Sequence, residues 1–234
     1  SAKPKPGAHA FEQVIAANLD QVVPVFAAAA PTPRWHLLDR ILVTAESYEI
    51  PSLIVITKTD LLAKKPEEQA LLEAVDRYRR IGYPVILTSA ASGEGVDALR
   101  QALAGQSSVL VGKSGVGKSS LLNCLEPGLG LRVKSVNNNT GKGRHTTTHL
   151  EMFPLASGGA LIDTPGVREF GIVGLEPEDI AYFFPEIAPL LGRCRFGMSC
   201  RHDDEPGCAV KAGVMDGAIS PYRYKSFLQL RADM

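Results

Sequence analysis

A glycine-rich stretch, Gly-Lys-Ser-Gly-Val-Gly-Lys-Ser at residues 112–119, follows an apolar run and precedes a helical pattern. It matches G-x-x-x-x-G-K-[ST], in which glycines let backbone N–H groups turn around a phosphate while the helix N-terminus adds a positive dipole end. A glycine-rich turn without a ligand is the alternative, but the flanking strand and helix favour a nucleotide-phosphate cradle. The residues expected to line it are Gly112, Lys113, Ser114, Gly115, Val116, Gly117, Lys118, Ser119 and Ser120.

Two polar side chains of this cradle and one distant aspartate could act on the phosphates and a cation. Lys118 is expected to reach the β- and γ-phosphates, and the Ser119 hydroxyl to bind Mg²⁺. Asp163 ends an apolar strand pattern and begins Asp-Thr-Pro-Gly, a D-x-x-G match. A strand-end aspartate is often only a turn residue. Its place after the cradle predicts instead that Asp163 holds Mg²⁺ through a water and that the Gly166 N–H senses the γ-phosphate.

The segment 132–150 is polar and has little hydrophobic periodicity, which predicts a long loop. A nucleotide hydrolase of this kind needs a threonine there to close over Mg²⁺ and the γ-phosphate. Thr148 is favoured because it stands just before the next strand, with Thr147 and Thr146 as alternatives. A surface loop without a ligand role is the other interpretation.

The stretch Thr57-Lys58-Thr59-Asp60 follows a buried strand pattern and resembles the guanine motif N-K-x-D. An aspartate carboxylate can accept hydrogen bonds from guanine N1–H and the 2-amino group together, which adenine cannot offer. Lys58 is expected to lay its stem along the base plane. Because Thr57 stands where asparagine is usual, part of the hydrogen bonding that braces this loop is in question.

A second loop after the next strand, Thr-Ser-Ala-Ala-Ser-Gly-Glu-Gly, could complete a guanine pocket. Ser89 and Ala90 occupy the positions of the S-A-x motif, and the Ala90 N–H is expected to meet guanine O6. This short motif is weak alone. It gains weight because one helical pattern separates it from the Thr57–Asp60 strand.

The order of these motifs is base reader, second base loop, cradle, polar loop and D-x-x-G. An ordinary GTPase begins with the cradle and ends with the two base loops, so the two orders are related by circular permutation. The expected helix 95–104 is joined by a short link to the strand 107–112. Such joins are tolerated because domain termini often lie close together.

Hydrophobic patterning along the chain alternates strand and helix signals, which predicts an α/β fold with a mainly parallel sheet and helices on both faces. Pro24, within the first strand, suggests an edge strand or a bulge. The expected strands cover residues 19–27, 52–58, 84–89, 107–112, 149–155 and 160–163, and the expected helices residues 35–47, 66–80, 95–104 and 118–125.

A cysteine and histidine cluster follows the last predicted strand, with the spacing Cys194-x5-Cys200-x-His202-x5-Cys208. Three thiolates and one imidazole form a complete tetrahedral set for structural Zn²⁺. A cluster of reduced cysteines without metal is the alternative. Cys124, on the helix after the cradle, is expected to be a core residue.

Together, the permuted order, "GKSGVGKSSLLN", "GRHTTTH", "DTPGVREFG" and the cysteine cluster resemble the RsgA (YjeQ) family of bacterial GTPases that depend on the small ribosomal subunit. The resemblance covers about residues 11–234. It implies GTP hydrolysis stimulated by the small (30S) subunit during late maturation, contact with ribosomal RNA, and a zinc motif at the four cluster residues. The family also has an N-terminal OB-fold domain, which we expect this sequence to lack.

The residue that orients the attacking water is not the usual glutamine, because Val167 occupies the position after D-x-x-G. Slow intrinsic hydrolysis is therefore expected. His145 is the candidate replacement, since an imidazole can accept a proton from water, and the family resemblance indicates the same residue. Arg144 or Arg168 could stabilise transition-state charge, and the sequence does not rank them.

The bulk composition is that of an ordinary globular chain, with 234 residues, 45% hydrophobic and 21% charged residues, and zero net charge. No apolar run suggests a membrane span, and the first residues do not read as a signal peptide. A cytoplasmic monomer is expected. We predict three segments: a flexible leader at 1–10, the permuted GTPase domain at 11–176 and a zinc-binding helical domain at 177–234.

Basic residues surround the cluster, but acidic residues offset them almost completely. A solvated, mixed-charge face is therefore as good an interpretation as an RNA-binding surface on charge alone, and the resemblance favours ribosomal RNA. The basic residues are Arg193, Arg195, Arg201, Lys211, Arg223, Lys225 and Arg231.

The main hypothesis is a Mg²⁺-dependent hydrolase that converts GTP to GDP. A GTP-gated RNA-binding module, in which hydrolysis only resets binding, is a second. An ATP-using protein with the same cradle is a third, and Asp60 argues against it.

Overall fold

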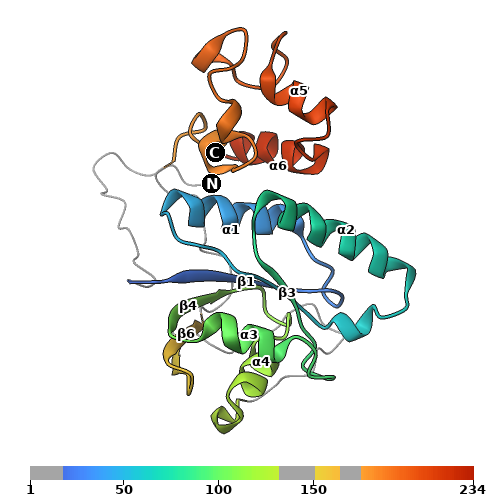
Figure 1. Cartoon of the computed structure of the whole chain (residues 1–234), viewed down its shortest axis with the longest axis vertical. Helices are drawn as coiled ribbons and strands as arrows, with labels where there is room; N and C mark the ends of the chain where they lie inside the picture. Colours follow the sequence, from blue (N-terminus) through green and yellow to red (C-terminus); the bar gives the residue numbers. More distant parts are fainter. Residues whose placement is uncertain (1–17, 132–150, 164–174) are drawn as a thin grey trace, which may run out of the picture.

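The computed structural model describes residues 18–131, 151–163 and 175–234. Its centre is a six-stranded sheet in the order β3-β2-β1-β4-β6-β5 (Figure 1). Five strands are parallel and β5 runs antiparallel to β6, so the predicted mainly parallel sheet is confirmed. The strands are β1 Gln21–Ala27, β2 Ile54–Thr57, β3 Val85–Leu87, β4 Gln106–Val111, β5 Glu151–Pro154 and β6 Gly159–Asp163.

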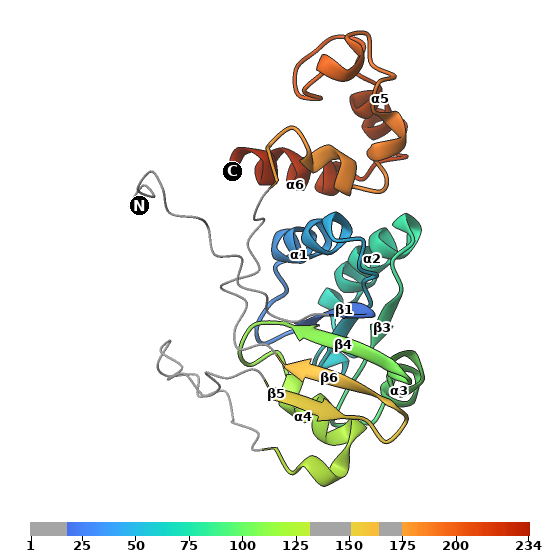
Figure 2. The same ribbon diagram turned by 90° about the vertical axis from the view of Figure 1, so that its left-hand side faces the viewer.

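Helices cover both faces of the sheet (Figure 2). On one face α1 (Trp35–Ser47) and α2 (Pro66–Ile81) pack against the strands through one apolar cluster. On the other face α3 (Val96–Leu103) and α4 (Lys118–Leu125) do the same through a second cluster. Two faces buried by helices explain why β1, β2 and β4 are rich in valine, isoleucine and leucine without polar alternation.

Pro24 does not mark an edge strand, because β1 lies between β2 and β4. Pairing of β1 with β4 runs from Gln21 to Pro24, whereas its regular pairing with β2 runs from Val25 to Ala27. Before Val25 the contact with the β2 side is an isolated bridge between Val22 and Ser52. Pro24, which has no N–H to donate, lies between this bridge and the regular β1–β2 ladder.

The C-terminal residues form a layer of helices and loops that packs on α1, above the sheet in Figure 1. They contain no strand from residue 175 onward. Their apolar cluster includes Val43 of α1 along with Phe184, Ile187 and Phe227. The helices of this layer are the 3-10 turns η3 Ile180–Phe183, η4 Ala188–Leu190 and η5 Gly197–Ser199, and the α-helices α5 Ala209–Met215 and α6 Pro221–Ala232.

A fully buried arginine joins this layer to the sheet domain. Arg223 of α6 donates to Asp39 Oδ1 of α1 at 2.6 Å and to both carboxylate oxygens of Glu186 at 2.6 and 3.1 Å. Tyr78 of α2 donates to the same Asp39 oxygen at 2.8 Å. The guanidinium also lies 4.4 Å from the ring centre of Phe184. We call Arg223, Asp39, Glu186 and Tyr78 the junction cluster.

Within the described residues, no helix is both long enough and apolar enough to cross a membrane.

Candidate functional site

The predicted phosphate cradle is a tight turn between the end of β4 and the start of α4. Gly112 has no room for a side chain, because a Cβ there would lie 2.5 Å from the backbone oxygen of Val25. Gly117, the N-cap of α4, has φ of 101°, a conformation that favours glycine. Both positions therefore require glycine because of the backbone geometry, as the motif predicts. The turn leads directly into the N-terminus of α4.

Lys118 lies inside this cradle. Its Nζ donates to the backbone oxygen of Gly112 at 2.7 Å and lies 3.8 Å from Asp163 Oδ1. Burial lowers the pKa of Lys118, and the nearby carboxylate of Asp163 offsets only part of that effect. A phosphate group placed beside this ammonium would favour its charged form.

Asp163 ends β6 beside the cradle, and the cation nearest to its carboxylate among the described residues is Lys118, at 3.8 Å. Its Oδ1 is buried and accepts no hydrogen bond from any residue that the structure describes. Burial raises the pKa of Asp163, Lys118 lowers it and Glu151 raises it further. A buried carboxylate oxygen without a partner is costly unless a cation or a water supplies one. The oxygen fits the predicted Mg²⁺ site, to which Ser119, the second residue of α4, would add a hydroxyl.

The base-reading loop is fixed against the cradle. Lys58 adopts a left-handed conformation with φ of 59°, which turns the chain sharply after β2. Its Nζ donates to the backbone oxygen of Gly115 at 2.7 Å, and the Thr57 hydroxyl donates to that of Val116. The bracing that the missing asparagine put in question is thus made by a threonine hydroxyl.

Asp60 is exposed at the start of a short 3-10 turn, η1 Thr59–Leu61, and its orientation is set by Ser89. The Ser89 hydroxyl donates to Asp60 Oδ1 at 2.6 Å and lies 3.2 Å from the N–H groups of Ala91 and Ser92. Thr59 reaches the same loop by donating to Thr88 O at 3.2 Å. The two loops predicted to read guanine are therefore joined, with the carboxylate facing out.

Ala90 lies in the second base loop, and Cys124 of α4 contacts it. The Cys124 thiol lies 3.7 Å from the Ala90 oxygen. Cys124 is partly buried and packs against the apolar cluster under α3 and α4, in agreement with a core position.

Several predicted site residues lie outside the described residues. They are His145, the three candidate threonines Thr146, Thr147 and Thr148, Gly166, Val167, Arg144 and Arg168. Their roles in water activation, Mg²⁺ binding and γ-phosphate sensing remain predictions.

The four cluster residues meet in the C-terminal layer. Their candidate ligand atoms all lie within 4.8 Å of one another and all four residues are buried. Cys194 Sγ lies 3.9 Å from Cys208 Sγ, and His202 Nδ1 lies 3.4 and 3.5 Å from these two sulfurs. Tetrahedral Zn²⁺ with standard bond lengths requires about 3.8 Å between sulfurs and about 3.5 Å from sulfur to nitrogen. The spacing fits that ion, with Nδ1 as the histidine ligand.

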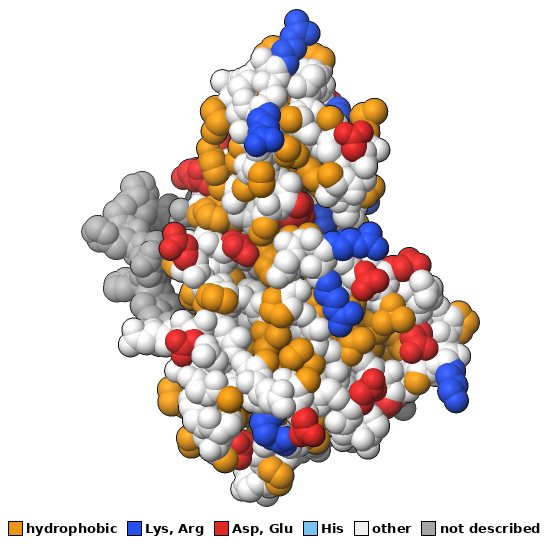
Figure 3. Space-filling view, in the orientation of Figure 1, with side chains coloured by type: hydrophobic (Ala, Val, Ile, Leu, Met, Phe, Trp, Pro, Cys, Tyr) orange, Lys and Arg blue, Asp and Glu red, His pale blue; other side chains and the backbone are white. Residues whose placement is uncertain are grey.

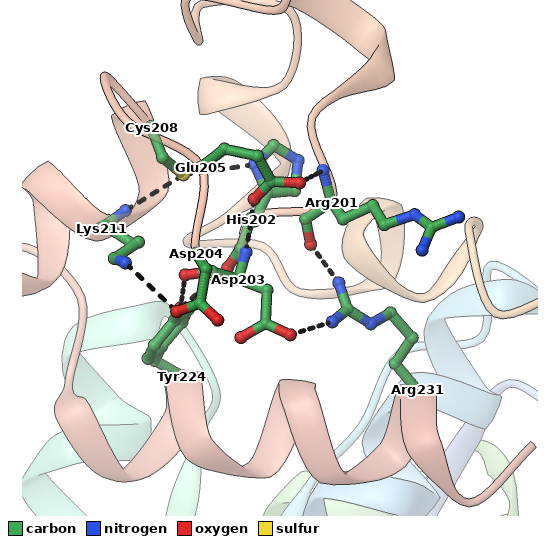
Figure 4. Close-up of polar contacts among 9 residues, drawn as sticks. All are labelled: Arg201, His202, Asp203, Asp204, Glu205, Cys208, Lys211, Tyr224 and Arg231. Carbon is green, nitrogen blue, oxygen red and sulfur yellow. Dashed lines mark hydrogen bonds and ion pairs between the residues drawn. The ribbon is translucent and has the colours of Figure 1, made fainter.

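Backbone and side-chain contacts hold this cluster from outside (Figure 4). N–H groups of Ala209 and Lys211 point at the sulfurs of Cys194 and Cys208, at 3.2 and 3.5 Å. Such N–H donors stabilise thiolates and orient metal ligands. Tyr224 of α6 donates to the backbone oxygen of His202 at 2.7 Å, which ties the ligand loop to α6.

Glu205 holds the loop that carries His202, a function that sequence reasoning missed. Its two carboxylate oxygens accept from the N–H groups of Arg201 and Asp203 at 2.8 and 2.9 Å. These backbone bonds lower the pKa of Glu205 to about 2. The signal available in the sequence was a glutamate within a turn of polar residues that follows the second cysteine.

The basic residues near the cluster are less available to nucleic acid than their number suggests. Arg223 is fully buried in the junction cluster, so its inclusion in a possible RNA surface was wrong. Arg231 donates to Asp203 and to the backbone oxygen of Arg201, and Lys211 lies 3.9 Å from Asp204. On the face in Figure 3, acidic and basic side chains are interspersed.

A family model described as RsgA GTPase matches residues 2–173. A protein named small ribosomal subunit biogenesis GTPase RsgA from Gemmatimonas aurantiaca is 48% identical over 233 residues, covering 100% of this chain and 74% of the relative. A protein of the same name from Ectopseudomonas mendocina is 46% identical, covering 94% and 63%.

Two solved structures also resemble this chain. YjeQ from Thermotoga maritima superposes with a TM-score of 0.78 at 34% identity, over 92% of this chain and 71% of that one. YloQ, described as a circularly permuted GTPase, superposes with a TM-score of 0.74 at 35% identity, over 92% and 68%. The permuted order of motifs along this chain therefore has solved counterparts.

Proposed function

The chain belongs to the RsgA GTPase family, and from that membership we propose that it binds GTP with Mg²⁺ at the ends of β2, β4 and β6 and hydrolyses it to GDP. It is a circularly permuted GTPase of small ribosomal subunit biogenesis. The observation that carries the proposal is the joined site: a base-reading loop held to a phosphate cradle, with a buried aspartate oxygen beside it that accepts no hydrogen bond from the described residues.

We assign the nucleotide contacts as follows. Asp60 would accept from guanine and Lys58 would lie along the base, with the Ala90 N–H at guanine O6. Lys118 and the backbone N–H groups of the cradle would bind the phosphates. Mg²⁺, when bound by Ser119, Thr148 and Asp163, supplies charge neutralisation of the β- and γ-phosphate oxygens. Asp163 would act through a water, and the Gly166 N–H would sense the γ-phosphate.

For hydrolysis we propose that His145 orients the attacking water, because Val167 cannot. Its effect would depend on ordering by a partner, so intrinsic turnover should be slow. The partner proposed is the small ribosomal subunit and its ribosomal RNA, acting late in subunit maturation.

For the C-terminal layer we propose structural zinc at Cys194, Cys200, His202 and Cys208, because the four donor atoms lie together and three of them, those of Cys194, His202 and Cys208, have the spacing that a tetrahedral ion requires. We also propose that the chain has three segments. They are a leader at 1–10, the permuted GTPase domain at 11–176 and this C-terminal layer at 177–234. We further propose that the protein is a cytoplasmic monomer. Metal analysis of the purified chain should give one zinc per chain, and the Cys208→Ser variant should give less.

The test of function is nucleotide hydrolysis by this chain with and without purified small subunits. Large subunits and ATP serve as controls. Hydrolysis of GTP alone, accelerated at least tenfold by small subunits alone, would support the proposal. GTP binding with a turnover that no subunit changes would favour a different partner. Equal use of ATP and GTP would overturn the assignment of Asp60.

A further inference from the structure

Glu151, the first residue of the edge strand β5, lies directly opposite Asp163, the last residue of β6. In an antiparallel pair, directly opposite residues point their side chains to the same face of the sheet, with Cβ atoms about 4.5–5.5 Å apart. The two carboxylates are therefore neighbours on one face. Of the two, only Asp163 has a role in the proposed function.

The face that these carboxylates share is the one that α3 and α4 cover. Leu161, two residues before Asp163, packs in the apolar cluster beneath those helices, and Phe153, directly opposite Leu161, packs against the same cluster. Ile162, which points to the other face, belongs to the cluster beneath α1 and α2. Because side chains alternate along a strand, Asp163 and Glu151 lie on the face of Leu161 and Phe153. Glu151 is therefore on the side of the sheet where α4 begins with the cradle lysine.

The charges at this end of the sheet are unequal. Lys118 Nζ lies 3.8 Å from Asp163 Oδ1, whereas Glu151 is exposed and forms no ion pair within the described residues. Burial raises the pKa of Asp163, Lys118 lowers it, and the Glu151 carboxylate raises it further, so the charge of Glu151 acts at Asp163. One ammonium therefore stands against two carboxylates, and the excess negative charge lies beside the oxygen proposed to hold Mg²⁺.

This excess has opposite consequences in the absence and in the presence of a divalent cation. Phosphates bring further negative charge to the cradle, so two carboxylates without a cation oppose them. Mg²⁺ keeps several of its waters when it binds to proteins, and a carboxylate outside its direct ligands can accept hydrogen bonds from those waters. Glu151 should therefore weaken nucleotide binding without Mg²⁺ and strengthen it with Mg²⁺.

We propose that Glu151 is a positioning residue that makes nucleotide binding depend on Mg²⁺: its carboxylate beside Asp163 orients the waters of the bound ion and opposes phosphate when the ion is absent. The proposal rests on the proposed function, because it concerns the same nucleotide and metal site. The alternative is an ordinary charged residue of an edge strand, whose charge only prevents pairing with another strand.

The experiment measures binding of a fluorescent, non-hydrolysable GTP analogue to the whole chain, once with Mg²⁺ and once with EDTA. The ratio of the Kd in EDTA to the Kd in Mg²⁺ isolates the contribution of the ion. We expect Glu151→Gln, which keeps the shape and removes the charge, to lower this ratio about tenfold, the lower end of the effect of an outer-shell partner on metal affinity. Glu151→Asp keeps the charge and should restore most of the ratio.

The matched control is Glu73→Gln in α2, on the opposite face of the sheet, which removes an exposed carboxylate that accepts from Gln69 at 3.0 Å. It should leave the ratio unchanged. An unchanged ratio in Glu151→Gln, including one that comes from equal weakening with and without Mg²⁺, would overturn the proposal in favour of edge protection. If Glu151→Gln does not fold, Glu151→Thr carries the same test with a residue that favours strands.

The proposed function can fail separately. If the wild-type chain binds the analogue in neither condition, the nucleotide assignment is wrong. If it binds equally well with Mg²⁺ and with EDTA, the assignment of Mg²⁺ to this site is wrong. If Mg²⁺ strengthens binding to the wild-type chain and to Glu151→Gln by the same factor, the proposed function stands and the role of Glu151 is wrong.

Discussion

A fully buried cation and a partly buried cation of this protein, Arg223 and Lys118, have opposite environments. Each of the three guanidinium nitrogens of Arg223, in the junction cluster, donates to Asp39 or Glu186 at 2.6 to 3.1 Å. Lys118 in the cradle donates to a backbone oxygen and stays 3.8 Å from Asp163. Burial would lower the pKa of Arg223, but the carboxylates of Asp39 and Glu186 raise it overall. The pKa of Lys118 is lowered by burial, which Asp163 only partly offsets.

The difference separates a structural ion pair from a site for an anion. Arg223 has its counter-charges within the fold, so its role is to hold α6 and the segment around Glu186 onto α1. Lys118 and Asp163 are each other's counter-charge at 3.8 Å, a longer separation than any in the Arg223 cluster, so both would gain if phosphate and Mg²⁺ bound between them. A mutation in the junction cluster should therefore lower the free energy of unfolding, whereas a mutation in the cradle should weaken ligand binding.

The largest expected effect is on stability. Replacing Arg223 by Met leaves Asp39 and Glu186 as buried, unpaired carboxylates and should lower the free energy of unfolding by about 3–5 kcal/mol. Urea denaturation followed by circular dichroism measures it. GDP affinity, measured where the variant is folded, should stay within about twofold of wild type. A loss of stability below about 1 kcal/mol would contradict the structural role of the pair.

The next effect is on metal-dependent binding. Asp163→Asn should lower Mg²⁺ affinity, measured in the presence of saturating GDP, by about 10–100-fold, because the metal loses a carboxylate. Its free energy of unfolding should change by less than about 1 kcal/mol, since the replaced carboxylate is desolvated and poorly paired. A large fall in stability with unchanged Mg²⁺ binding would reverse the comparison between the two sites.

A smaller effect concerns pH. Because the pKa of Lys118 is lowered in the folded state, its ammonium is lost as the pH rises through that folded pKa, below the ordinary value of 10.5. The preference for GDP over GMP should therefore decline on the alkaline side before pH 10.5 is reached. Using the ratio of the two Kd values cancels titration of the guanine base. The sign for unfolding is opposite: a depressed lysine pKa disfavours the folded state at low pH, so this contribution improves as the pH rises.

The smallest effect tests the same junction at its surface. Arg40 of α1 donates to Asp233 at 3.1 Å, and both side chains are partly exposed. The Arg40→Met variant should lose at most about 1 kcal/mol of stability, because exposed pairs contribute little. It is the matched control for Arg223→Met, since both variants remove an arginine that joins α1 to α6. Equal losses in the two variants would mean that burial does not distinguish these pairs.

The motifs of the site followed from sequence because their function depends on local spacing. A phosphate cradle is predicted from local backbone geometry alone. The pattern needs glycines at 112 and 117, a lysine and a serine at the next two positions, and a helix after them. The cysteine and histidine spacing likewise predicted a four-residue cluster, and the structure brings the four together. The mainly parallel sheet could also be predicted, because the alternation of strand and helix patterns is a local property of the sequence.

Contacts between side chains that are far apart in the sequence could be read from the folded chain alone. Arg223 and Asp39 are 184 residues apart, and Thr57 and Val116 are 59 apart. No local pattern distinguishes an arginine that will be buried from one that will face solvent, so Arg223 was grouped with surface residues. The contacts of the Thr57 and Ser89 hydroxyls could be placed only once β2, β3 and β4 were known to belong to one sheet, with β1 between β2 and β4. Local spacing along the chain was therefore enough to identify the groups that could bind a nucleotide, whereas the packing of the sheet and its helices sets which of them hold one another in place.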